Sequence, residues 1–237
     1  MAIDTTYRTE ATEIMDDFSL ASEELQDALD KIASINQLLG GNRLTLNGVK
    51  KLLDICDTTQ TITIADIGCG NGDMLRMLAD YATQKNIVLQ LIGIDANAFT
   101  IAYAQKLSAA YPNISYSCVD IFSPAFEDVT YDIVLCTLTL HHFKEDEIVN
   151  IISIFSKNAT TGILINDLHR SLLAYRLFEC ICWIFRLNRM SREDGLVSIL
   201  RGFKKKELED FSKKLNVNRY SIRWKWAFRY QWIIYKR

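Results

Sequence analysis

Proline, regularly spaced cysteine and long uncharged apolar runs are scarce in this chain of 237 residues. Only two prolines occur, so the sequence offers no flexible linker and predicts one domain over residues 1–237. Six cysteines without regular spacing argue against a zinc site and favour a reducing compartment. The most apolar run, Leu172 to Leu187, contains Arg176, Glu179 and Arg186, and is too short and too charged to span a bilayer.

The charge balance narrows the choice of partners. A net charge of -2 gives no general attraction to nucleic acid. Acidic residues gather in 1–31 and basic residues in 201–237. These two stretches predict either mutually attracting solvated faces or a surface for an anionic partner. The acidic N-terminal stretch also lacks the apolar core of a signal peptide, so we expect a cytoplasmic protein.

A glycine-rich turn follows a strand pattern in residues 61–73, which read Thr-Ile-Thr-Ile-Ala-Asp-Ile-Gly-Cys-Gly-Asn-Gly-Asp. Ile62–Ile67 is composed like a strand, and a helical pattern begins after the turn. Such a turn lets the backbone approach a ligand and present free N–H groups to it. In a dinucleotide-binding turn the third glycine comes three positions after the second. Here Gly72 follows Gly70 by only two, and Asp73 would repel a pyrophosphate.

Three further strand patterns end at residues that could face a ligand. The second strand ends in Asp95, and a carboxylate there can accept both ribose hydroxyls of any adenosine-containing cofactor. The third ends at Asp120 and Ile121, and the fourth leads into Thr137. Ligands of open α/β sheets bind at the carboxyl ends of strands, so these residues are expected to meet at one site.

Four elements in this order and spacing resemble the class I S-adenosylmethionine (SAM) methyltransferases. The strand with its Gly-x-Gly-x-Gly turn is similar to motif I of that family, and Thr137–Phe143 is similar to its fourth motif. The resemblance implies SAM as cofactor and an α/β fold: a Rossmann-like, seven-stranded, mostly parallel sheet with helices on both faces. The cofactor-binding residues that it implies are Asp66, Gly68, Cys69, Gly70, Asn71, Asp95, Ala96, Asp120, Ile121 and Thr137.

Apolar spacing predicts how the remaining segments are organised. Apolar residues from Ile14 to Leu39 recur at spacings of three and four, which predicts one long amphipathic helix stopped by Gly40 and Gly41. The first half of the segment after the fifth strand lacks clear helical periodicity, which predicts burial on more than one side. The expected divisions are an N-terminal helical cap (1–57), a SAM-binding core (58–170), a substrate-pocket insertion (171–203) and a C-terminal helix with strands (204–237).

Methyl transfer to a hydroxyl benefits from a base near the acceptor, and histidine suits this role. His141 and His142 follow the fourth strand, and as neighbours they are expected to point apart, so that at most one faces the pocket. Asp167 and His169 follow the fifth strand, either in the pocket or in a polar turn that caps the next helix. The predicted catalytic residues are His142, His169 and Asp167, and no metal is predicted because the acid clusters lack ligand spacing.

A narrower resemblance comes from Leu39–Arg43, Asn166–Arg170, and Ser191–Gly195 with Ser198–Phe203. Together they look like a bacterial group of small-molecule methyltransferases associated with polyketide or phenolic-lipid pathways. This implies methylation of a hydroxyl on a hydrophobic phenolic or quinol-like molecule. Methylation of carbon or nitrogen, and a non-catalytic SAM-binding role, stay open. So do a peripheral membrane or carrier-protein contact through Leu172–Leu187, and a monomer or homodimer.

Overall fold

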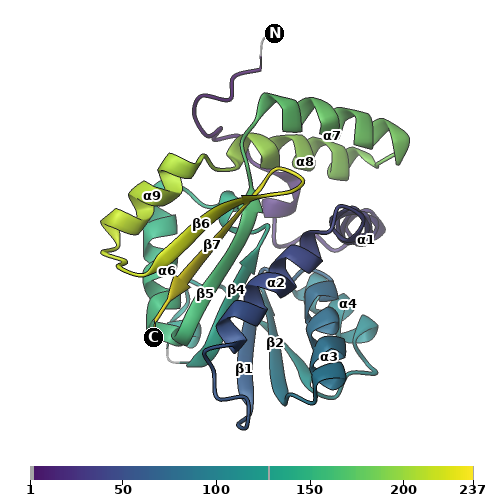
Figure 1. The fold of residues 1–237 in the computed structure, drawn as a ribbon. Helices are drawn as coiled ribbons and strands as arrows, with labels where there is room; N and C mark the ends of the chain where they lie inside the picture. The colour runs from purple at the N-terminus through teal and green to yellow at the C-terminus, as the bar shows by residue number, and fades with distance from the viewer. Residues whose placement is uncertain (1–2, 128, 237) are drawn as a thin grey trace.

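The computed structural model describes residues 3–127 and 129–236, so the expected outer limits 1 and 237 lie outside it. Within these residues the strands form one seven-stranded sheet in the order β3-β2-β1-β4-β5-β7-β6 (Figure 1). Strands β1 to β5 run parallel, and β7 is antiparallel to both β5 and β6. The strands are β1 (Ile62–Ile67), β2 (Leu89–Asp95), β3 (Ile114–Cys118), β4 (Tyr131–Thr137), β5 (Ala159–Leu168), β6 (Tyr220–Lys225) and β7 (Arg229–Tyr235). The predicted fold class is confirmed.

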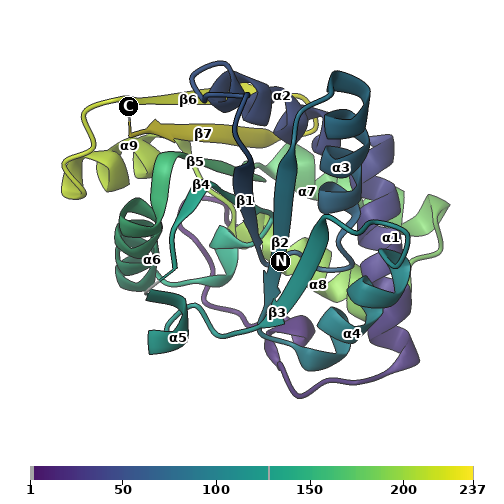
Figure 2. The same cartoon turned by 90° about the horizontal axis from the view of Figure 1, so that it is seen from below.

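Helices cover both faces of the sheet and its carboxyl edge. One face carries α2 (Gly41–Leu53), α3 (Asp73–Lys85) and α4 (Ala98–Leu107), and the other carries α5 (Pro124–Glu127), α6 (Glu145–Asn158) and α9 (Lys205–Lys214) (Figure 2). Above the carboxyl ends of the parallel strands lie α1 (Glu23–Leu38), α7 (Leu172–Ile184) and α8 (Arg189–Arg201) (Figure 1). The third group of helices therefore covers the edge at which sheets of this kind bind ligands.

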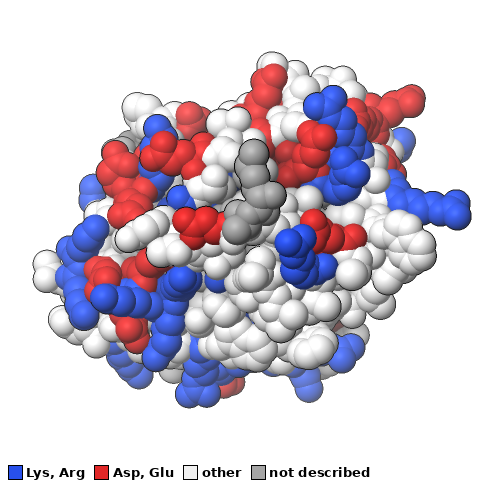
Figure 3. Space-filling view, turned by 90° about the horizontal axis from the view of Figure 1, so that it is seen from above, with Lys and Arg blue, Asp and Glu red and all other residues white. Residues whose placement is uncertain are grey.

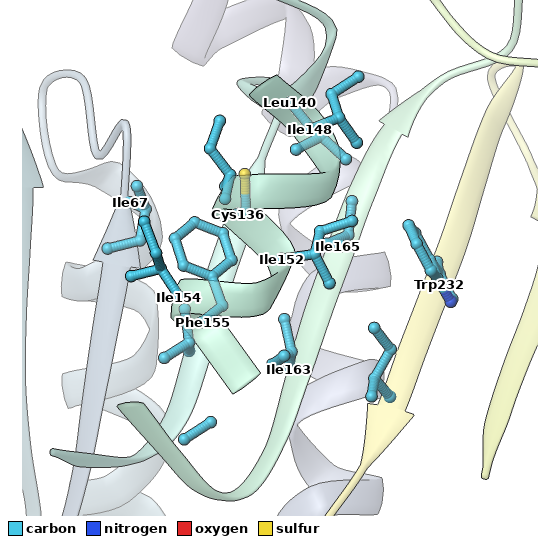
Figure 4. Packing of buried hydrophobic residues seen from close by; sticks show 14 of the residues in the cluster. Ile67, Cys136, Leu140, Ile148, Ile152, Ile154, Phe155, Ile163, Ile165 and Trp232 are labelled. Atoms are coloured by element: carbon cyan, nitrogen blue, oxygen red, sulfur yellow. The ribbon is translucent and has the colours of Figure 1, made fainter. Parts of the chain in front are cut away.

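The parallel strands are apolar on both sides because both faces are covered. Helix α6 presents Ile148, Ile152 and Phe155 at a spacing of four and three, which makes one apolar stripe against the sheet. Figure 4 shows this stripe pointing toward Ile163 and Ile165 of β5. Burying each such side chain contributes roughly 1.5–3 kcal/mol, so this packing holds the strand ends in fixed positions.

The long N-terminal helix that apolar spacing predicts is shorter in the structure. Helix α1 begins only at Glu23, because the side chain of Ser22 accepts the backbone N–H of Leu25 and caps it. Its predicted end is correct, since Gly40 has a left-handed φ of 76°. The chain then enters α2 directly at Gly41.

Residues 3–22, which we call the N-terminal strap, cross the carboxyl edge with only a 3-10 turn, η1 (Ile14–Asp16). The carboxylate of Asp194 in α8 accepts the backbone N–H groups of Ile14 at 2.7 Å and Met15 at 2.9 Å. The buried guanidinium of Arg170 donates to the carbonyl oxygens of residues 5 and 6. Tertiary hydrogen bonds therefore occupy backbone groups that a helix would use, and this explains why the helical pattern fails here.

The expected burial of the insertion on several sides is also wrong. Helix α7 packs against α8, and of its described residues only Ala174 and Cys182 are buried. Its other sides face the cavity or solvent. No described helix is both long and apolar enough to cross a membrane.

Candidate active site

The turn between β1 and α3 requires its glycines. Gly68, Gly70 and Gly72 have left-handed φ angles of 67°, 53° and 77°. A Cβ atom on Gly68 would lie 2.3 Å from Oγ1 of Thr139, and one on Gly72 would lie 2.0 Å from the hydroxyl of Tyr116. The first and third positions of the motif thus exclude a side chain by space as well as by conformation.

Three carboxylates surround this turn. Asp66 ends β1 and is 2% exposed, and no described group donates a hydrogen bond to its Oδ1. Burial, with a smaller contribution from the nearby carboxylates of Asp73 and Asp95, raises the pKa of Asp66 to about 8. Acidic groups therefore surround the turn, so it suits a cationic ligand and disfavours binding of a pyrophosphate.

Asp95 shapes the turn as well as facing the cavity. Its Oδ2 accepts the backbone N–H of Gly70 at 3.2 Å, and its Oδ1 accepts that of Asn97 at 3.0 Å. Asn71 donates from Nδ2 to Asp30 of α1 at 3.2 Å. A residue of α2 also supports the turn, because Asn42 donates a hydrogen bond to the carboxylate of Asp73 at 2.6 Å. Helices α1 and α2 therefore hold the glycine turn from above.

One cavity of about 1010 Å³ occupies the carboxyl edge of the sheet. Every residue predicted to bind cofactor lines it: Asp66, Gly68, Cys69, Gly70, Asn71, Asp95, Ala96, Asp120, Ile121 and Thr137. His142 and His169 line it too, whereas Asp167 lies behind His141 and is buried. The structure thus brings together residues from β1, β2, β3, β4 and β5.

His141 and His142 do not point apart. They share the 3-10 turn η2 (Leu140–His142), and their ring centroids are 4.4 Å apart. Each ring has its own carboxylate: Nδ1 of His141 lies 2.7 Å from Asp167, and Nδ1 of His142 lies 2.7 Å from Asp16. Because a carboxylate only accepts, each Nδ1 carries a proton that it donates to its partner. Two histidine–aspartate pairs therefore stand side by side, and the partly exposed His142 is the outer one.

The strap supplies two acids to these pairs. Burial raises the pKa of Glu13, whose Oε1 lies 3.7 Å from Nε2 of His141. Burial also raises the pKa of Asp16, but hydrogen bonds from His142 and Arg201 outweigh it, so the net pKa is well below the usual range. Glu13, His141 and His142 lie close enough to hold a metal ion. The Arg201 guanidinium, 2.7 Å from Asp16, already supplies a positive charge there.

His169 occupies a different part of the wall. Trp224 donates its indole N–H to Nδ1 of His169 at 3.2 Å, so Nδ1 is the acceptor and Nε2 carries the proton. Burial and the charges of Arg170 and Lys204 lower the pKa of His169. This ring is therefore neutral, and its lone pair is engaged.

Four further residues line the cavity although no sequence motif predicts them: Glu13, Asp16, Arg201 and Arg229. The acidic N-terminal stretch was the one available signal for the first two. No spacing links these acids to strand ends more than a hundred residues away, so only the folded chain reveals the contact.

Residues 64–162 match the model of a family described as a methyltransferase domain. The core of the chain, from within β1 to within β5, is therefore similar to methyltransferase domains. The chain is 33% identical over 86 residues to a protein of Invertebrate iridescent virus 6, 235L, whose name describes it as a methyltransferase. That match covers 36% of this chain and 29% of the viral protein, so the chain spans less than a third of this relative.

Solved structures of methyltransferases share the fold of this domain. The plantazolicin methyltransferase BpumL, in complex with a triazolic desmethylPZN analog and SAH, superposes with a TM-score of 0.64 at 18% identity, over 91% of this chain and 90% of that one. Magnesium protoporphyrin IX methyltransferase from Synechocystis PCC 6803, with bound SAM, gives a TM-score of 0.55 at 16% identity, over 85% and 81%. At such low identity these similarities establish the fold.

Proposed function

We propose that the protein is a SAM-dependent methyltransferase acting on a small molecule. The observation that carries this proposal is the set of carboxylates at the glycine turn, with the unpartnered Oδ1 of buried Asp66. A buried acceptor without a donor needs one from a ligand. SAM carries an ammonium group and a sulfonium charge, which complement Asp66, Asp73 and Asp95, whereas a dinucleotide brings a pyrophosphate.

The chain's own residues fit the rest of this cofactor. Asp95 and Ala96 would hold the ribose, Asp120 and Ile121 the adenine, and Thr137 the region near the sulfonium. When bound, SAM supplies an electrophilic methyl group. The protein then needs to align an acceptor atom with that methyl, exclude water and accept a proton.

His142 is the base that we favour for a hydroxyl acceptor. Asp16 fixes its tautomer and leaves Nε2 free, as an orienting carboxylate does in other His–Asp pairs. His141 is buried at 2% exposure, and Nδ1 of His169 already accepts from Trp224. Asp167 would act through His141 as a positioning residue. His169 would line the part of the cavity that holds the methyl acceptor.

A hydrophobic phenolic or quinol-like acceptor fits the outer cavity. Leu177, Phe178 and Ile181 of α7 line it together with Trp224 and Phe228, so apolar and aromatic side chains form a large share of its wall. Methylation of carbon or nitrogen is the alternative chemistry, and a non-catalytic SAM-binding role is the alternative function.

Methyl transfer from isotope-labelled SAM to a panel of apolar phenols, hydroquinones and amines tests the proposal. We expect label in a phenol or hydroquinone, with NMR placing the methyl on oxygen. Asp95→Asn is the matched variant, because it keeps the size of the side chain and removes the charge; it should weaken SAM binding and leave thermal unfolding nearly unchanged. Label on carbon or nitrogen would select the alternative chemistry. Tight SAM binding with no transfer to any acceptor would favour the non-catalytic role.

A further inference from the structure

Arg229 is a buried cation without a hydrogen-bond partner in the described chain. It begins β7, lines the cavity and is 4% exposed, and neither Nε nor Nη1 meets an acceptor. Burial lowers its pKa to about 10, so the guanidinium is still charged at neutral pH. An unpaired charge of this kind strongly destabilises a protein unless a ligand completes it.

Asp167 lies near Arg229 but forms no hydrogen bond with its guanidinium. Asp167 contributes attraction to this guanidinium, but its oxygens already accept from Nδ1 and the backbone N–H of His141 and from the N–H of Leu168. The donors of Arg229 therefore remain available to a group that enters the cavity.

A second unpartnered atom faces the same space. Oδ1 of Asn36 is buried and accepts no hydrogen bond from a described residue. A Cβ atom on Gly41 would lie 1.8 Å from this oxygen and 3.1 Å from Cζ of Arg229. The amide oxygen of Asn36 and the guanidinium of Arg229 therefore lie close together beside Gly41, which has no side chain. This arrangement suits a ligand with both an ammonium group and a carboxylate.

We propose that Arg229 binds a carboxylate in this cavity, either the methionine carboxylate of the cofactor or an acid group of the acceptor. The nearby acceptor of Asn36 favours the cofactor. This inference rests on the proposed function, and it adds a binding residue that lies outside all the motifs of the sequence.

Calorimetric titration separates the possibilities. Wild-type protein is titrated with S-adenosylhomocysteine (SAH) and with its carboxamide, and the pair is repeated with Arg229→Gln and Arg229→Lys. Arg223→Gln on the neighbouring strand is the matched control, because that arginine is exposed. If Arg229 holds the cofactor carboxylate, wild type binds the carboxamide about 10- to 100-fold more weakly than SAH, and Arg229→Gln abolishes the difference.

If Arg229→Gln unfolds, Arg229→Lys replaces it, because lysine keeps the charge but not the fork of N–H donors: the preference of wild type for SAH over the carboxamide should then shrink, and an unchanged preference would overturn the cofactor version. Equal binding of SAH and its carboxamide, together with inhibition by aromatic carboxylates that Arg229→Lys weakens, would assign the acceptor version. Equal binding of both cofactor products without any carboxylate inhibition would overturn the inference. Failure of wild type to bind SAH at all would instead refute the proposed function.

A separate observation concerns the mouth of the cavity. Large apolar side chains stand exposed on α7 and on the β6–β7 hairpin, and we call them the apolar rim: Leu173 (58% exposed), Leu177 (46%) and Ile184 (62%) of α7, with Trp224 (50%) and Trp226 (70%) of the hairpin. Leu177, Trp224 and Trp226 also line the cavity, so the rim is continuous with it. Figure 3 looks onto the carboxyl edge of the sheet and shows an uncharged area in its lower right part, bordered by basic and by some acidic side chains.

Cations without acidic partners flank the rim. The pKa of Lys51 is lowered by burial and by the charges of Lys225 and Arg223, so these three cations lie near one another beside the hairpin. None of them, nor Arg186 at the end of α7, forms an ion pair with a described residue, unlike Arg176 and Arg189. An apolar surface with tryptophan and unpaired cations complements an anionic lipid surface.

We infer that the apolar rim docks on an anionic membrane surface and admits an apolar acceptor from it. Vesicles of phosphatidylcholine, with and without phosphatidylglycerol, test this by sedimentation and by tryptophan fluorescence. Three of the four tryptophans are exposed, at Trp183, Trp224 and Trp226, whereas Trp232 is buried. We expect binding and a blue shift with anionic vesicles only.

Trp226→Ala combined with Ile184→Ser should abolish that binding, and Val88→Ser, which removes an equally exposed apolar side chain far from the rim, should not. Equal binding by both variants, or no binding to anionic vesicles, would overturn the inference. So would a concentration-dependent dimer that only the rim variant disrupts, because the rim would then be a contact between two copies of this chain.

Discussion

At the scale of single residues, buried polar groups without partners identify the site most clearly. Asp66 lacks a donor and Arg229 lacks an acceptor, and both face the same cavity. Natural folds leave few buried polar groups unpaired, so an unpartnered acceptor and an unpartnered donor in one cavity indicate a ligand that supplies both a donor and an acceptor.

Asp66→Asn should change how stability depends on pH. The native pKa of about 8 lies above the value of about 4 for an exposed aspartate. Native protein therefore keeps a proton that the unfolded chain has released, and stability falls as pH rises from about 4 to about 8. The variant lacks this loss, so its free energy of unfolding should gain on wild type by up to about 1.4 kcal/mol per pH unit in that window. Urea unfolding at several pH values measures it, and a constant difference would contradict the assignment.

His142→Asn should lower kcat by about 100-fold or more if His142 accepts the proton. Asp16→Asn should lower it less, because the base remains but its orienting carboxylate is lost. Binding of SAH should stay within a factor of a few in both variants. His169→Asn is the comparison: an equal loss of kcat in that variant, with His142→Asn still active, would transfer the role of base to His169.

At the scale of elements, the N-terminal strap and the glycine turn both line the cavity. The turn is local, and its sequence pattern predicts it correctly: β1 is observed at the residues predicted, with Asp95 closing β2. The strap depends on Asp194 and Arg170, which are distant in sequence. Apolar periodicity near Ile14 therefore misled the prediction, because it registers burial without showing which tertiary group takes the backbone N–H.

Gly68→Ala and Gly70→Ala separate strain from steric exclusion. Both substitutions force a side chain into a left-handed conformation, which costs about 1 kcal/mol. Only the Cβ of Gly68 would also overlap Thr139, at 2.3 Å, whereas that of Gly70 would meet only Leu29, at 3.7 Å. The midpoint temperature of thermal unfolding should therefore fall further in Gly68→Ala than in Gly70→Ala. Equal losses would mean that the turn yields to the added methyl.

Asp194→Ala should release the strap from α8. The N–H groups of Ile14 and Met15 lose their acceptor, and Asp16 and Glu13 lose their fixed position beside His142. Hydrogen exchange should rise in residues 3–22 while β1 stays protected, and kcat should fall with it. Asp194→Asn, which keeps one acceptor, should fall between. Unchanged exchange in the strap would show that Arg201 and Arg170 hold it without Asp194.

At the scale of the whole molecule, the sheet and its flanking helices place the carboxyl ends of the strands at one edge. Helices α1, α7 and α8 and the strap cover that edge, and we call them the roof (Figure 1). The sheet could be predicted because strand composition and turn chemistry are local. The roof could not: α7 is apolar on sides that face solvent and the cavity, so its composition gives no single buried face. The residues that complete the site, Asp16 and Arg229, come from this roof and from the last hairpin.

We propose that the carboxylates at the glycine turn select a cationic adenosine cofactor. Calorimetric titration of the purified protein with SAH, run beside NADH, tests this most directly. We predict binding of SAH in the micromolar range and none of NADH, with SAH binding weakened in Asp66→Asn. Binding of NADH without SAH, or of neither, would contradict the account.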